Sequence, residues 1–254
     1  MLGFSQDTPP TEKLDRHPDK IKEINFGPEL EALFNKREFI YERLNAIDST
    51  DLKPTLEELE LIAKLDETVG DQWDAIGGGC SWYCGGGDCT VTASSELMSK
   101  SELLNYVAEN AFDLQFKNAW TEGVKGNGIG EFLSYSFPAK HPRINEIIVV
   151  NGYVKSKAAY KNNSRVKTLA VYYNNKTLAI LHLKDIRGKQ SFGFSPIGNT
   201  RTERYLKETN SWQTKIDSAQ GDWVLKFEIL EVYEGDKYED TVISEIYFDG
   251  LDVH

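Results

Sequence analysis

The chain has 254 residues, of which 40% are apolar and 27% charged, a composition that excludes collagen-like, coiled-coil and wholly disordered classes. Acidic residues outnumber basic ones by 40 to 29, and the net charge of −11 argues against a general nucleic-acid binder, because phosphate backbones require a cationic surface. The start MLGFSQDTPP lacks the basic and apolar runs of a signal peptide, and no stretch approaches the roughly 18 to 20 apolar residues of a membrane span.

The acidic excess is concentrated in a helical first third. Up to Ile76 the chain carries 18 acidic against 9 basic residues, whereas the remainder has a net charge of only −2. Pro28 followed by apolar residues at helical spacing as far as Leu44 predicts one helix. Thr55 with Glu58 is a capping-box pair that predicts a second. We therefore expect an acidic helical segment over residues 1–78 and a separate domain over residues 79–254.

After Gly77 the pattern changes to alternating or continuous β-branched and aromatic residues, which indicate strands. The expected strands are Thr90–Ala93, Ile129–Phe137, Ile144–Val150, Val166–Tyr173, Thr177–Leu183, Gln190–Phe194, Trp223–Tyr233 and Thr241–Phe248. Asn174 and Asn175 predict a two-residue hairpin turn, since Asn tolerates positive φ. Eight strands without long helices between them predict a mainly β protein, an antiparallel sandwich or jelly roll.

The loop GGGCSWYCGGGDC carries the three cysteines and two candidate ligand-binding aromatics. Cys80, Cys84 and Cys89 do not have zinc-site spacing, and a local disulfide or buried thiols are the favoured interpretation. Trp82 and Tyr83 present ring faces that suit stacking on a sugar. An equally favoured interpretation is that the two rings pack in the seam, the interface between the helical segment and the sandwich.

Residues 155–207 hold twelve Lys and Arg but only two acids, Asp185 and Glu203. This basic stretch either docks the acidic helical third or binds an external anion. Within it, Tyr160, Asn163 and Arg165 combine the aromatic ring, amide and guanidinium that recognise hydroxyl-rich or anionic ligands. The alternative interpretation is that these residues form a turn that carries an arginine on the protein surface. No nucleophile motif or catalytic histidine arrangement is present, so we do not expect an enzyme.

A set of motifs in fixed order extends from Thr92 to Gly250: TASSEL, NAFD, AWTEG, GNGIGEFLSYSF, INEIIVVNGY, NNSRVKTLAVYY, LEVYEGDKYEDT and ISEIYFDG. They resemble the translocation domain that precedes the catalytic part of streptococcal NAD glycohydrolase, a discoidin-like, galactose-binding-like domain. The resemblance implies an eight-stranded jelly roll that binds glycans through loops at one end, without catalysis, on an exported or cell-surface protein. The helical third lies outside the resemblance, and nothing suggests NAD hydrolysis.

The resemblance also implies positions for a structural calcium ion. Asp113, Asn118 and Glu245 stand where discoidin-like domains often hold calcium, although calcium takes six to eight oxygens and this first loop has a single acid. Glu122 in AWTEG is a core or rim residue of the family pattern. Apart from this calcium, we expect no cofactor.

The sequence thus predicts a non-catalytic binding module that recognises a carbohydrate or similar polar ligand. The expected ligand-binding residues are Trp82, Tyr83, Glu122, Tyr160, Asn163 and Arg165. The alternative is a protein-interaction or assembly module that uses the acidic helices and the basic strand region to engage a partner or a second copy.

Overall fold

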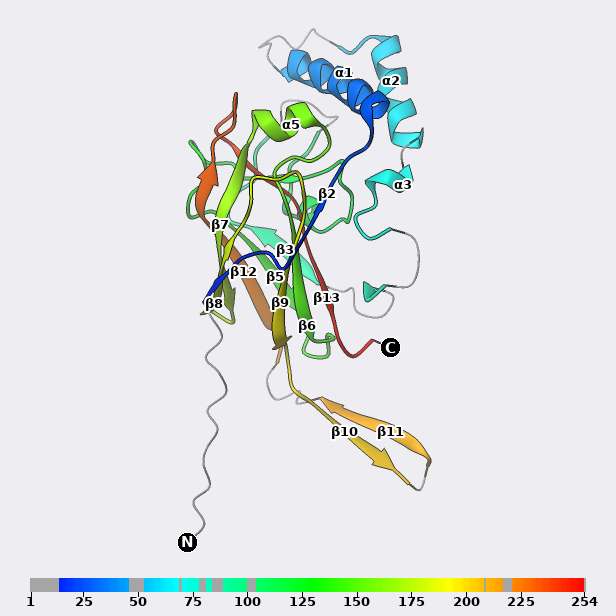
Figure 1. Ribbon diagram of the computed structural model, residues 1–254, viewed down its shortest axis with the longest axis vertical. Coiled ribbons are helices and arrows are strands. Elements are labelled where there is room, and N and C mark those ends of the chain that lie inside the picture. The colour runs from blue at the N-terminus through cyan, green and yellow to red at the C-terminus, as the bar shows by residue number, and fades with distance from the viewer. Residues whose placement is uncertain are drawn as a thin grey trace.

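The computed structural model describes residues 14–45, 53–68, 70–77, 81–83, 89–99, 104–207, 209–216 and 221–253. A β-sandwich forms the body, helices pack at one end, and a two-stranded hairpin projects from the other end (Figure 1). The predicted fold class, a mainly β jelly-roll sandwich with a small helical segment, is confirmed.

Two layers of strands make the sandwich. One layer contains, in pairing order, β2 (Lys20–Glu23), β9 (Gly188–Ile197), β6 (Ile144–Asn151), β13 (Thr241–Gly250) and β4 (Trp120–Thr121). The other contains β1 (Asp15–Arg16), β8 (Lys176–His182), β7 (Ser164–Tyr173), β12 (Trp223–Tyr233), β5 (Phe132–Phe137) and β3 (Thr90–Ala93). A short parallel pairing of β13 with β7, at Thr241–Ser164 and Val242–Arg165, joins the layers.

Aromatic side chains fill the space between the layers. The ring of Phe248 on β13 lies 5.3 Å from that of Tyr135 and 5.4 Å from that of Phe137, both on β5. Phe137 in turn stacks on the fully buried Trp223 at 4.1 Å. Burial of such large rings is the main favourable contribution to folding of the sandwich.

The helices cover the outer face of β6 and β13. Helices α1 (Pro28–Asn45), α2 (Leu56–Thr68) and α3 (Gly70–Trp73) bury Phe34 and Trp73 against Val150 and Tyr247. Loops cover the rest of this face, where Ser244 Oγ donates to the Gly152 carbonyl and Glu245 Oε1 accepts from Gln115 N. As a result, β13 is buried at eight successive positions. The predicted capping box is confirmed: Thr55 N donates to Glu58 Oε2 at 2.8 Å, and Glu58 N donates to Thr55 Oγ1 at 3.3 Å.

All eight predicted strands form, and the hairpin turn has positive φ at Asn174 (46°) and Asn175 (64°), as expected. The sequence patterns did not predict β1, β2 and β4, the hairpin of β10 (Arg201–Leu206) and β11 (Ser211–Ile216), or the short helices α3, η1 (Ala108–Ala111) and α5 (Lys157–Asn162). Since β1 and β2 pair with β8 and β9, the first segment contributes strands as well as helices. Within the described residues, the helices are too short or too polar to cross a bilayer.

Candidate functional site

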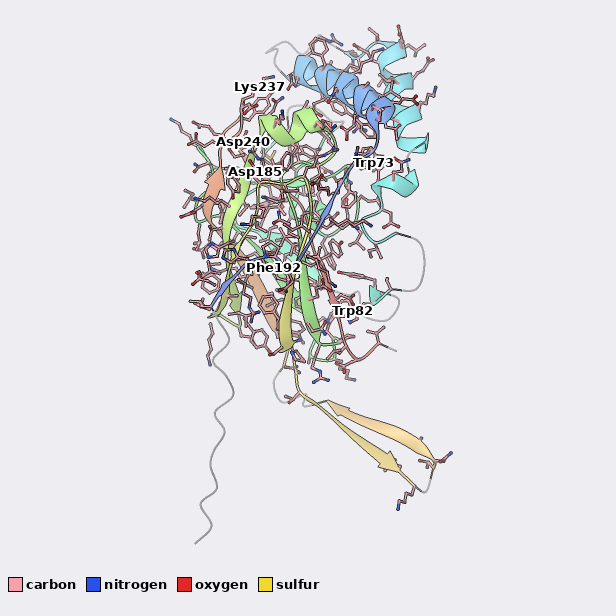
Figure 2. All side chains as sticks on the ribbon, viewed as in Figure 1. Trp73, Trp82, Asp185, Phe192, Lys237 and Asp240 are labelled. Atoms are coloured by element: carbon pink, nitrogen blue, oxygen red, sulfur yellow. The ribbon has the colours of Figure 1, made fainter. Side chains whose placement is uncertain are left out.

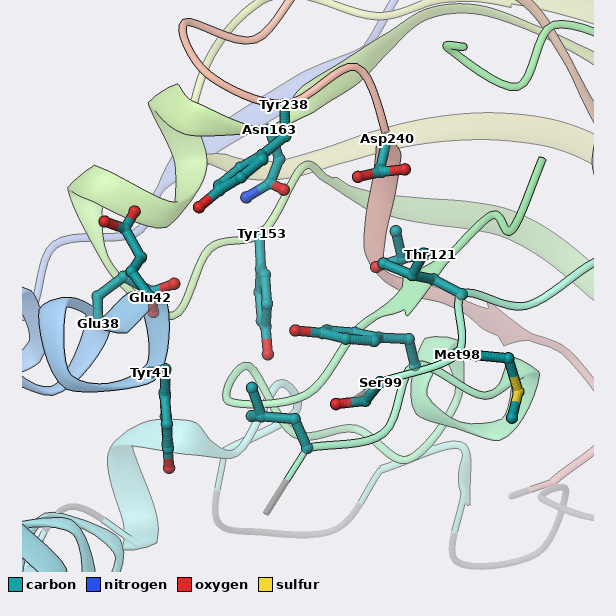
Figure 3. A pocket seen from close by; sticks show the side chains of 13 residues that line it. Glu38, Tyr41, Glu42, Met98, Ser99, Thr121, Tyr153, Asn163, Tyr238 and Asp240 are labelled. Carbon is teal, nitrogen blue, oxygen red and sulfur yellow. The ribbon is translucent and has the colours of Figure 1, made fainter. Parts of the chain in front are cut away.

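A cavity of about 220 Å³ lies where α1 meets the loops at the helical end of the sandwich (Figure 3). Most of its walls are aromatic or polar: Tyr41, Tyr106, Tyr153 and Tyr238, the carboxylates of Glu38, Glu42 and Asp240, and the shorter side chains of Ser99, Thr121 and Asn163. Three apolar residues complete the lining. Among the described residues, no Lys, Arg or His lines this cavity.

The tyrosine wall is held by a buried lysine beneath it. The Nζ of Lys155 lies 4.2 Å from the ring centre of Tyr153 and 2.9 Å from Glu38 Oε2 on α1. Only 3% of the Lys155 side chain is exposed, so Glu38 supplies its counter-charge inside the protein. Burial raises the pKa values of the Tyr153 and Tyr106 phenols, which therefore stay protonated at neutral pH and can donate hydrogen bonds.

Thr121 and Asp240 stand on the opposite wall (Figure 3). Thr121 is only 2% exposed, and its Oγ1 has no hydrogen-bond partner within the described part of the chain. Burial raises the pKa of Asp240, with the neighbouring Glu239 adding to the effect. An unpaired buried hydroxyl costs about 1–3 kcal/mol unless a partner satisfies it.

Glu42 anchors the outer side of the cavity to two other elements. Its Oε1 accepts from Asn162 Nδ2 on α5 at 3.0 Å, and its Oε2 pairs with Lys237 Nζ at 2.8 Å. Helix α5 begins at a Ser156 cap, whose Oγ accepts from Ala159 N at 3.0 Å. The cavity is therefore framed by α1, α5 and the loop before β13.

The Tyr160–Arg165 motif forms a network beside the cavity. Asp185 accepts from Tyr160 Oη at 2.9 Å and from the Arg165 Nε and Nη2 at 3.1 and 2.7 Å. Asn163 alone of this motif lines the cavity. Tyr160 and Arg165 are each 8% exposed, and their polar groups are bound within the protein. Their expected role in ligand recognition stays a prediction, and their contacts fix α5 to β7.

Trp82 lies elsewhere, toward the end of the sandwich opposite Lys237 and Asp240 (Figure 2), and neither Trp82 nor its chain neighbour Tyr83 lines the cavity. Trp82 is 6% exposed and donates from Nε1 to the Leu251 carbonyl at 3.2 Å. The Tyr83 hydroxyl accepts from Phe248 N at 2.7 Å, and the ring packs on both the sandwich core and the helical cluster. These contacts match the seam interpretation, since protein covers the faces that sugar stacking requires. Cys89 packs on the same core, while Cys80 and Cys84 lie outside the described residues.

Glu122 follows Thr121 but is fully buried and serves the neighbouring turn. Its Oε1 accepts from Thr241 N at 3.1 Å and its Oε2 from Val124 N at 2.9 Å. Gly128 has φ +63°, and a Cβ there would lie 2.4 Å from Glu122 Cγ. Through these contacts Glu122 holds the turn at Gly128, and it does not line the cavity.

We expect Gly128→Ala to lower the free energy of unfolding by on the order of 2 kcal/mol, since it adds a clash to a left-handed backbone conformation. Urea denaturation measures the change. In a Glu122→Ala background the clash disappears, so the penalty should shrink to the backbone strain alone. Equal penalties in both backgrounds would show that Glu122 does not hold this turn.

Sequence comparison places the sandwich in a family. Residues 82–249 match the family described as the NAD glycohydrolase translocation F5/8 type C domain, and this range covers well over half of the 254 residues. The chain belongs to this family. The resemblance read from the ordered motifs is thus confirmed, and α1, α2 and α3 precede the matched range. A search among curated proteins gave no sequence match.

Solved structures are similar to this translocation-family chain at low sequence identity and low TM-score. CpGH89CBM32-5 from Clostridium perfringens, in complex with GalNAc-β-1,3-galactose, is 13% identical with a TM-score of 0.40, covering 64% of this chain and 95% of that one. The family 32 carbohydrate-binding module of Streptococcus pneumoniae EndoD is 10% identical with a TM-score of 0.39, covering 63% and 96%. Arabinofuranosyltransferase AftD from Mycobacteria is 16% identical with a TM-score of 0.41, covering 65% and 11%. No residue role is transferred from these distant likenesses.

The three residues expected to bind calcium in this translocation-family domain do lie together. Asp113 Oδ2 accepts from Asn118 Nδ2 at 2.6 Å. Asp113 Oδ1 and Glu245 Oε1 both accept from Gln115 N, at 2.8 and 2.7 Å. Glu245 is fully buried, and its Oε2 has no hydrogen-bond partner among the described heavy-atom donors.

This arrangement does not fit calcium. Three of the four carboxylate oxygens already accept N–H groups, and Asn118 turns its amide nitrogen, a donor, toward Asp113. Among the described residues no group of three His, Cys, Asp or Glu side chains is placed to hold a metal ion. Burial and the adjacent Asp113 raise the pKa of Glu245 well above its ordinary value, and burial raises that of Asp113. A proton on Glu245 would satisfy Oε2 without a cation, and the raised pKa favours that proton.

Protonation of Glu245 predicts a pH dependence. Because the folded-state pKa exceeds the unfolded value near 4.5, the folded state keeps a proton that the unfolded state releases. The free energy of unfolding should therefore fall as the pH rises above the unfolded value near 4.5, and Glu245→Gln should flatten that slope. Urea denaturation at a series of pH values above 4.5 measures the slope. Addition of calcium or a chelator should leave the melting temperature unchanged, and stabilisation by calcium would contradict the assignment.

Proposed function

We propose that this chain is a non-catalytic carbohydrate-binding module whose ligand enters the cavity beneath α1. Tyrosine rings offer apolar faces to the C–H surface of a sugar, while carboxylates and an amide accept and donate hydrogen bonds to its hydroxyls. Membership of the translocation-domain family supports a binding role. The observation that carries the proposal is the Thr121 side chain, which lines the cavity and whose buried Oγ1 has no hydrogen-bond partner among the described residues.

An array of neutral, amino-bearing and acidic saccharides, probed with the intact chain, tests the proposal. A set of related saccharides bound above background supports it, and an array without a hit contradicts it. Isothermal titration then gives affinities for the wild type and its variants. Phe39→Ala is a matched control, because Phe39 lies on the same helix but is 67% exposed and lies outside the cavity lining.

Thr121→Val separates ligand binding from folding. The replacement keeps the shape of the side chain and removes a hydroxyl that has no partner in the described part of the chain, so we expect unchanged or slightly increased stability. The affinity for the saccharide should fall by about tenfold, since one buried hydrogen bond to the ligand is lost. Thermal melting and titration of the same preparation measure both. A destabilised variant with unchanged affinity would show that Thr121 has a structural partner and no ligand.

The alternative, a protein-interaction module, has a different basis. Large apolar side chains are exposed on the helical pair, notably Phe39 and Leu56, the latter 76% exposed. However, acidic residues of α1 already pair with basic residues of the sandwich, Glu38 with Lys155 and Glu42 with Lys237. Light scattering at low and high salt discriminates, because salt-labile association supports the alternative and a strict monomer opposes self-assembly.

We further propose an exported or cell-surface location, which protease accessibility on intact expressing cells tests.

A further inference from the structure

One face of α1 carries three acidic residues that meet basic partners on the sandwich. Glu31, Glu38 and Glu42 are spaced by seven and four positions, which places them on one side of a helix. Glu31 pairs with Arg187, and both side chains are nearly buried, with 5% and 9% exposed. Glu38 and Glu42 pair with Lys155 and Lys237 at 2.9 and 2.8 Å. The helix is therefore attached along much of its length and is not a loose appendage.

Two of these three acids also line the cavity, and the third does not. Glu38 and Glu42 belong to its lining together with Tyr41, whereas Glu31 lies nearer the start of the helix. Figure 3 shows Glu38, Tyr41 and Glu42 projecting from α1 on one side, with Asp240 and Thr121 on the other. Helix α1 precedes the range matched by the family, so this wall lies outside the part of the chain that the family match covers.

We infer that α1 is a structural wall of the saccharide site, and that its carboxylates restrict the ligand to saccharides without acidic groups. The inference rests on the proposed function. The cavity presents the carboxylates of Glu38, Glu42 and Asp240, while the ammonium groups of Lys155 and Lys237 lie behind the first two. An acidic sugar entering it meets like charges at close range in a partly desolvated space, which costs far more than in water. Neutral hydroxyls, by contrast, donate to these carboxylate oxygens.

The test uses pairs of glycans with identical backbones, one neutral and one terminally sialylated, printed on one array. The variants are Glu38→Gln and Glu42→Gln, and the matched control is Glu31→Gln, which loosens the same helix without touching the cavity. We expect the wild type to bind sialylated members about tenfold more weakly than their neutral partners. Glu42→Gln should lower neutral binding about fivefold and narrow the difference between the pair members.

The outcomes separate the two proposals. A wild type that binds no glycan removes the proposed function and the inference together. A wild type that binds neutral and sialylated members equally, or cavity variants that keep the wild-type ratio, overturns the inference alone. If Glu31→Gln lowers glycan binding as much as the cavity variants do, α1 acts only through its attachment to the sandwich. That result also overturns the inference. Circular dichroism on each variant confirms that α1 remains folded.

Discussion

Replacing Tyr106 by alanine is expected to raise the dissociation constant for a bound saccharide by about tenfold to a hundredfold, an effect typical of an aromatic residue at the centre of a binding site. Tyr106 lines the cavity, and its ring centre lies 6.3 Å from that of Tyr153 in an edge-to-face arrangement. The two rings therefore form a corner of the cavity lining, which would contact a sugar bound there on two sides. Isothermal titration measures the change.

A second substitution distinguishes ring stacking from the phenol hydroxyl. Tyr106→Phe keeps the ring and should retain most of the affinity, while Phe39→Ala removes an exposed ring of the same helical end and should have no effect. Equal losses in Tyr106→Phe and Tyr106→Ala would assign the contact to the hydroxyl. If Tyr106→Ala binds the saccharide as tightly as the wild type, the Tyr106 ring does not contact the ligand.

Replacing Lys155 by methionine is expected to cost about 3 kcal/mol of unfolding free energy, because it leaves the carboxylate of Glu38 without its counter-charge in a mostly buried position. Methionine preserves the packing of the aliphatic stem against Tyr41 and Tyr153, whose ring centres lie 5.0 and 4.2 Å from the lysine nitrogen. The loss therefore reports on charge and not on a cavity. Urea denaturation of the intact chain measures it.

The matched control is an exposed ion pair elsewhere on the sandwich. Lys167 and Glu231 lie 3.0 Å apart with 48% and 56% of their side chains exposed, so Lys167→Met should change stability very little. The double variant Lys155→Met with Glu38→Gln should recover most of the loss, since no buried charge remains. Equal effects of Lys155→Met and Lys167→Met would show that the attachment of α1 does not depend on the buried pair.

Much of the fold follows from local patterns in the sequence. The strands β3 and β12 begin and end at the predicted residues, because their alternating apolar residues face a single core. The strand β2, with the sequence KIKE, was not predicted. All four of its residues are exposed at the sheet edge, so the sequence shows no apolar alternation there. The hairpin β10–β11 pairs only with itself, so the core imposes no apolar alternation on its sequence.

The cavity was harder to foresee, because its walls come from separate parts of the chain. Tyr106, Thr121, Tyr153 and Asp240 have no shared motif, and only the tertiary fold brings them to one place. Asn163 was the one expected ligand residue that lines it. A usable signal did exist: acids at 31, 38 and 42 match one helical face, and the basic stretch from Lys155 supplied a surface to receive it. The ion pairs show that the acidic face of α1 docks on the basic stretch, which is one of the two interpretations that the sequence left open.

A structure of the intact chain with a saccharide selected on the array would show where the ligand binds. We expect a sugar ring in the cavity between α1 and the loop before β13, with one hydroxyl within hydrogen-bond distance of Thr121 Oγ1 and an aromatic contact to Tyr106 or Tyr153. A saccharide bound at another place on the sandwich, with none in the cavity beneath α1, would contradict the proposed site.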